Sequence, residues 1–98
     1  MPTKIDFLIA KMSAFEKTLE NLDNKTKAGH VPTQLAENFN KLLAEIEAES
    51  SDAASELPSP IALGGDFADM GITEISYVAL EVMVGQVLGI LGVLKAGR

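Results

Sequence analysis

The stretch VMVGQVLGILGVLKAGR, residues 82–98, decides the fold, because it continues a long apolar segment that has to be covered by something. Between residues 75 and 94 the only charged side chain is Glu81, and apolar residues occupy every face of a helix drawn through the segment. A helix that is apolar on every face is normally surrounded by other protein elements or by lipid. We therefore predict an apolar helix over residues 73–96, capped by Thr73 and buried on all sides.

Glycines inside this helix need an explanation, because each one costs roughly 1 kcal/mol of helix stability relative to alanine. Gly85, Gly89 and Gly92 lie on one side of the helix together with Glu81 and Ala96, since the successive spacings are four, four, three and four. A row of small residues lets two helix backbones approach closely. We call these five residues the glycine ridge and predict that they form a helix-helix interface.

Two amphipathic helices are predicted before the apolar one. Thr3 and Asp6 have the spacing of a capping box, which predicts a first helix over residues 3–28. A second helix is predicted over residues 33–49, and the short turn between the two makes an antiparallel hairpin. The apolar positions that support them, at spacings of three and four, are Ile5, Leu8, Met12, Phe15, Leu19 and Leu22, then Leu35, Phe39, Leu42, Leu43 and Ile46.

Residues 50–71 are rich in serine, proline, glycine and acidic residues and show no sustained period. This composition predicts a long connector. A connector of that length inside a small domain needs anchoring, and we expect Ile61, Leu63 and Phe67 to pin it across the hairpin.

Residues that could carry chemistry are few. The chain has no cysteine and one histidine, His30, which lies in the predicted hairpin turn. Asp66 and Asp69 follow two glycines, but the rest of an EF-hand calcium loop is missing. No nucleophile has a base at a recognisable spacing, and no glycine loop precedes a phosphate-binding lysine. We predict a protein that is not an enzyme and holds no metal or cofactor.

The charge balance bears on partners and location. Eight basic residues against fourteen acidic ones give a net charge of −6, and the only arginine is Arg98, so nucleic acid is an unfavourable partner. The first fifteen residues lack a signal-type cleavage site, and the absence of cysteine is compatible with a reducing compartment. We expect a cytoplasmic protein.

Together these patterns predict an all-α fold, a single domain over residues 1–98 in which a helical hairpin and the apolar helix form a bundle completed by oligomerisation. The expected function is self-assembly, as a dimer to tetramer, or docking of another helical protein. The alternative is a membrane-associated protein, since residues 73–95 would rise about 34 Å, enough to cross a hydrocarbon core of about 30 Å. Glu81 within the segment, and basic residues only at its C-terminal flank, disfavour that alternative.

Overall fold

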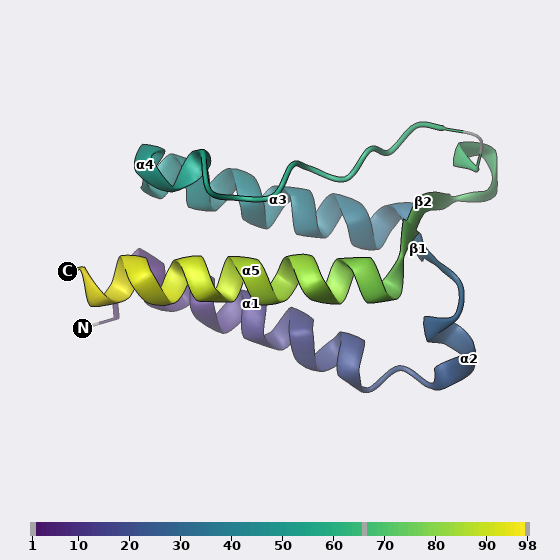
Figure 1. Cartoon of the computed structure of the whole chain (residues 1–98), viewed down its shortest axis with the longest axis horizontal. Coiled ribbons are helices and arrows are strands. Elements are labelled where there is room, and N and C mark those ends of the chain that lie inside the picture. The colour runs from purple at the N-terminus through teal and green to yellow at the C-terminus, as the bar shows by residue number, and fades with distance from the viewer. Residues whose placement is uncertain (1, 66, 98) are drawn as a thin grey trace.

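Three long helices run side by side in the computed structural model of the chain (Figure 1). The structure describes residues 2–65 and 67–97, so Asp66 and Arg98 lie outside the described part. Two of the three helices, α1 and α3, form the antiparallel hairpin, and α5 runs antiparallel to α1. The bounds of the three are α1 Lys4–Glu20, α3 Thr33–Glu49 and α5 Tyr77–Ala96.

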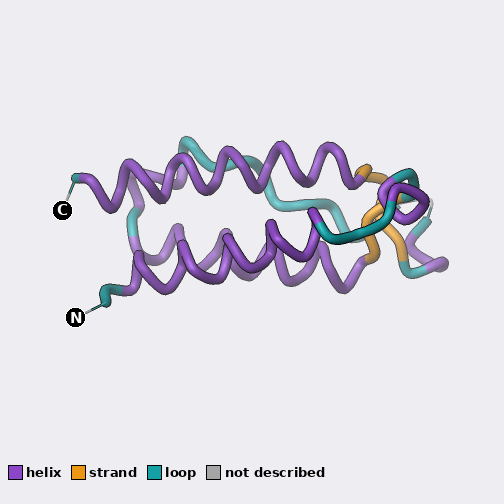
Figure 2. Tube along the Cα trace, turned by 90° about the horizontal axis from the view of Figure 1, so that it is seen from below, coloured by secondary structure: helices purple, strands orange, loops and turns teal. Residues whose placement is uncertain are grey.

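Short elements connect these helices. A two-stranded antiparallel ladder closes one end of the bundle, as the orange segments of Figure 2 show. The mostly helical fold therefore agrees with the all-α prediction, with this small sheet as an addition. The short elements are α2 Asn24–Lys27, β1 His30–Pro32, α4 Ser51–Ala54, the 3-10 helix η1 Ala68–Met70 and β2 Ile72–Ser76.

The first helix is shorter than the predicted 3–28. It ends at Glu20, and a separate turn of helix follows because Asp23 acts as a new N-cap. The backbone N–H of Thr26 donates to Oδ1 of Asp23 at 2.7 Å. An aspartate that caps a new helix competes with continuation of the old one, because its carboxylate satisfies the amide at the start of the new turn.

Residues 72–76 form a strand where a helix beginning at Thr73 was predicted. Thr73 is buried, and its hydroxyl donates to the carbonyl oxygen of Val31 at 2.9 Å, which ties β2 to β1. The segment ITEIS is rich in β-branched side chains, which favour a strand over a helix. The N-cap of α5 is instead Ser76, whose Oγ accepts the backbone N–H of Ala79 at 3.1 Å.

The core lies between α1, α3 and α5. Phe39 of α3 is completely buried, and its ring centroid lies 6.0 Å from that of the half-buried Phe15 on α1. Such a tilted aromatic pair adds a specific contact to the burial of apolar surface. The predicted seams of the hairpin supply six further core residues: Ile5, Leu8, Met12, Leu19, Leu43 and Ile46.

The connector crosses the length of α3 in an extended course (Figures 1 and 2). Ile61 is buried in the core and Leu63 packs against it, as predicted, while Phe67 is half-buried beside His30. A polar anchor holds the same point. The side chain of Asn40 accepts the N–H of Ile61 at 2.8 Å and donates to its carbonyl oxygen at 3.0 Å. These two bonds satisfy both backbone polar groups of Ile61, as a neighbouring strand would in a sheet.

A charged cap joins the start of α1 to the end of α5, which lie at the same end of the bundle (Figure 1). Thr3 and Asp6 form the predicted capping box, with the Thr3 N–H donating to the Asp6 carboxylate at 2.9 Å. Lys95 of α5 lies 3.0 Å from the same carboxylate. The Thr3 amide and then Lys95 hold the pKa of Asp6 below its ordinary value, because both favour the charged carboxylate.

Phe39→Ala should lower the free energy of unfolding by about 3 to 5 kcal/mol, because it removes a fully buried ring and leaves a cavity. The control is Glu45→Ala, which removes two partly exposed ion pairs, with Lys11 and Lys4, and should cost at most about 2 kcal/mol. Thermal and urea denaturation followed by circular dichroism measure both. Equal effects of the two substitutions would contradict the assigned core.

Asp6→Asn should flatten the dependence of stability on pH. A carboxylate whose folded pKa is lowered stabilises the fold above its unfolded pKa, about 3.9, and this contribution disappears as the pH falls through the folded pKa. The parent chain should therefore exceed the variant in melting temperature at neutral pH, and the difference should close once the pH has fallen below the lowered pKa of Asp6. Glu37→Gln, at an exposed site on α3, is the control; a constant difference for Asp6→Asn across this range would contradict the cap.

Candidate interaction surface

The inner face of α5 packs on α1. Its buried residues recur at spacings of three and four, which places them on one side of the helix. Because α1 contacts both α3 and α5, this inner seam joins the C-terminal helix to the hairpin. The inner seam consists of Tyr77, Leu80, Val84, Val87 and Leu91.

The opposite side of α5 is exposed and almost entirely apolar. Val78, Val82 and Val93 are 65%, 58% and 71% exposed. Gln86 is the one polar side chain on this side of the helix within the described residues. Large apolar side chains at such exposure, aligned along one helix, form a patch of the kind that marks an interaction site. We call this surface the outer face; its members are Val78, Val82, Gly85, Gln86, Gly89, Gly92, Val93 and Ala96.

The glycine ridge falls on the outer face, apart from its first member. Gly85, Gly89, Gly92 and Ala96 are exposed, and a Cβ built on any of the three glycines would meet nothing within 4 Å. Glu81 is half-buried at the edge and pairs with Lys27 of α2 at 3.4 Å. Gly85, Gly89, Gly92 and Ala96 therefore lie along one exposed side of α5, while Glu81 at the edge contacts α2.

The prediction that the apolar helix is buried on all sides is wrong for the single chain. A three-helix arrangement supplies neighbours for only part of the surface of α5: α1 covers the inner seam, and the connector flanks one edge. Sequence composition indicated how much apolar surface the helix carries. It did not indicate how few neighbours the chain provides for that surface.

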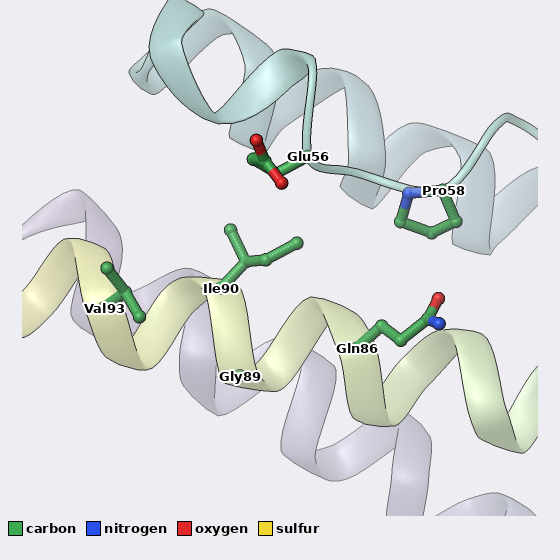
Figure 3. A pocket seen from close by; sticks show the side chains of 6 residues that line it. All are labelled: Glu56, Pro58, Gln86, Gly89, Ile90 and Val93. Atoms are coloured by element: carbon green, nitrogen blue, oxygen red, sulfur yellow. The ribbon is translucent and has the colours of Figure 1, made fainter.

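A groove borders the outer face between α5 and the start of the connector (Figure 3). Its volume is about 370 Å³. Across it Ile90 of α5 points toward Glu56, and Gln86 points toward Pro58. An adjoining hollow of about 340 Å³ adds Asp52 and Leu94. The groove therefore combines an apolar floor with an acidic edge, which suits an apolar side chain of a partner better than an anionic ligand.

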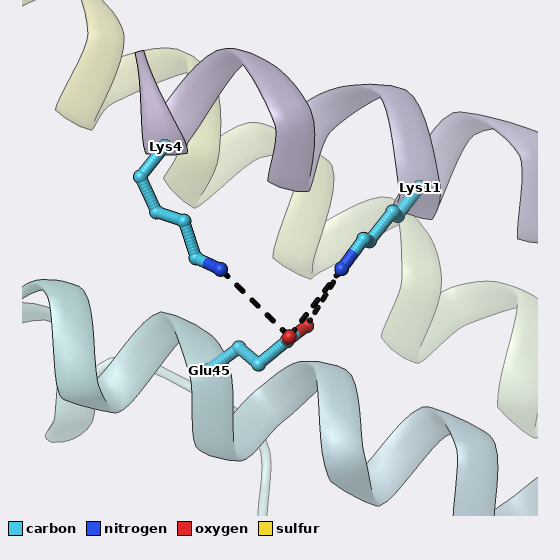
Figure 4. A network of polar contacts seen from close by, with 3 residues as sticks. All are labelled: Lys4, Lys11 and Glu45. Atoms are coloured by element: carbon cyan, nitrogen blue, oxygen red, sulfur yellow. Dashed lines mark hydrogen bonds and ion pairs between the residues drawn. The ribbon is translucent and has the colours of Figure 1, made fainter.

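A polar cluster lies elsewhere, where α1 faces α3 (Figure 4). Glu45 accepts Lys11 at 3.3 Å and lies 3.9 Å from Lys4. All three side chains are at least one third exposed, so each pair contributes no more than about 1 kcal/mol. This cluster orients two helices and offers no acid-base pair.

The remaining chemistry is structural in character. The described residues contain no group of three or more His, Cys, Asp or Glu side chains that could hold a metal ion. His30 is exposed and its ring lies 5.4 Å from that of Phe67. Asp23 has its pKa lowered because the side chain and backbone of Thr26 hydrogen-bond to its carboxylate, which is the capping role already described.

Gly89→Ala should raise the free energy of unfolding of the dilute, monomeric chain by about 1 kcal/mol, because helix propensity improves and the added methyl group meets open space. Urea denaturation at the lowest measurable concentration tests this. Gly97→Ala, beyond the end of α5, should change the same quantity much less. A loss of stability for dilute Gly89→Ala would mean that a segment of the same chain packs over the glycines.

Comparisons of the chain with models of known protein families, with curated proteins and with solved structures give no match. The fold and the outer face therefore supply the grounds for a functional proposal.

Proposed function

We propose that this protein is a non-enzymatic self-association module, and that the outer face of α5 binds another copy of the chain. The observation that carries the proposal is the exposure of aligned valines beside glycines with open space above them. A helix that presents this surface to water loses the favourable burial of several side chains. Covering it with a second helix recovers that burial and brings two backbones close together.

The size of the domain supports the same proposal. A chain of 98 residues buries a limited share of its surface, and small domains commonly gain stability by association. Closed assemblies of low order, from dimer to tetramer, are the commonest way to cover such a face. An adaptor function, in which the outer face binds an amphipathic helix of another protein, uses the same surface with a different occupant.

Membrane association is the second candidate. Within the described residues, α5 is the one helix long and apolar enough to cross a bilayer by length and composition. The inner seam makes insertion costly, because Leu80, Val84 and Leu91 would have to leave the core of the bundle. The acidic Glu56 beside the outer face also disfavours an anionic lipid surface. We therefore rank self-association first.

Val82→Glu should dissociate the assembly, because an unpaired carboxylate buried in an apolar contact costs several kcal/mol. Light scattering in plain buffer should give a mass between two and four times the chain mass of 10.4 kDa for the parent, and a mass near that of one chain for the variant. Met70→Glu, at a side chain that is 71% exposed outside α5, should leave the parent mass unchanged.

A parent chain that is monomeric at every concentration would contradict self-association. The same samples can be mixed with phosphatidylcholine vesicles and separated by flotation. Recovery of the protein with the vesicles, together with a monomeric mass in plain buffer, would support the membrane candidate instead.

A further inference from the structure

The outer face has a symmetric pattern along α5. We call six of its positions the central seam: Val78, Val82, Gly85, Gly89, Gly92 and Ala96. Successive positions are four, three, four, three and four residues apart, so the seam is symmetric about residue 87. Two antiparallel copies would therefore place each seam residue opposite another one. The facing pairs would be Val78 with Ala96, Val82 with Gly92, and Gly85 with Gly89.

Side-chain size distinguishes the two possible directions of packing. The N-terminal part of the seam carries Val78 and Val82, and the C-terminal part carries only glycine and alanine. In a parallel pair, valine would meet valine at one end and glycine would meet glycine at the other, which forces the helices apart at one end and leaves a gap at the other. In an antiparallel pair every valine faces a small residue, so packing stays close along the whole contact.

Charge favours the same direction. Glu81 and Lys95 lie on the same flank of the seam, each one residue before a seam position. An antiparallel pair brings Glu81 of one copy beside Lys95 of the other, twice per dimer, whereas a parallel pair puts these flanks on opposite sides of the contact and leaves the charges apart. Within each copy Glu81 already pairs with Lys27, and Lys95 with Asp6, so the intermolecular pairs would extend these into alternating rows.

We propose that two copies of this chain pack outer face against outer face with their α5 helices antiparallel, related by a two-fold axis at the level of residue 87. This inference rests on the self-association proposed above and adds its direction and register. Antiparallel helices also place opposite ends of their macrodipoles beside one another, which is favourable. The partner is thus a second copy of the same chain.

The absence of cysteine makes a crosslinking test direct. Val78→Cys and Ala96→Cys are prepared as separate single variants, both at exposed sites, and their folding is checked by circular dichroism. Each is oxidised alone and after mixing with the other under conditions that allow subunits to exchange. Covalent dimer is measured on non-reducing gels, and Glu37→Cys on α3 reports the background from random collision.

Only the mixture should give a covalent dimer well above background. In the proposed register the thiol introduced at position 78 of one copy faces the thiol introduced at position 96 of the other. Two copies of the same variant instead place their thiols about 27 Å apart along the axis, far beyond the reach of a disulfide. Crosslinking of Val78→Cys with itself, at the level expected of the mixture, would show parallel packing and overturn the proposal.

The masses of the reduced variants separate this inference from the proposed function. Monomeric masses at all concentrations, for the parent and for both variants, would reject self-association and the register with it. A dimeric mass without crosslinking in the mixture would keep self-association and overturn the outer-face register.

Discussion

The contact between the inner seam of α5 and α1 is the interaction on which the rest of the structure depends. Through it the C-terminal helix joins the hairpin, because α1 contacts both α3 and α5. This contact also fixes the rotation of α5 about its own axis. Once Leu80, Val84 and Leu91 point into the core, the outer face has to point away from it.

That rotation explains why the glycines look unfavourable within a single chain. Gly85, Gly89 and Gly92 together reduce helix propensity by about 3 kcal/mol, and no neighbouring segment of the chain uses the space they leave. For a domain whose total stability is of the order of 5 to 15 kcal/mol, this is a large loss. A partner bound to the outer face, as proposed above, would offset this loss.

Sequence reasoning succeeded where periodicity was long and local signals agreed. The helix predicted over 33–49 is confirmed as Thr33–Glu49, and the capping box of Thr3 and Asp6 is present. Two boundaries were missed, although both had a local signal: Asp23 restarts a helix after Asn21, and the β-branched residues of 72–76 favour a strand. At the first boundary a capping carboxylate outweighed the apolar pattern, and at the second a short run of residues with high β propensity did so.

The candidate surface was only partly predictable for a different reason. The 3.6-residue period of a helix is enough to place the glycine ridge on one side of α5, so the grouping of those residues could be derived. Whether that side is covered depends on how many helices the chain can bring to it, which no local pattern encodes. The value of the exposed valines as a sign of interaction appeared only once α1 was seen to cover the other side.

The ladder between β1 and β2 has a consequence for the order in which the protein folds. The bond from Thr73 to Val31 joins residues 42 apart in sequence, whereas only residues 21–32 connect α1 to α3. Closing a longer loop costs more chain entropy, so local contacts form first. The hairpin should therefore assemble early and α5 should join last, and until it does, the apolar surface of both is open to aggregation.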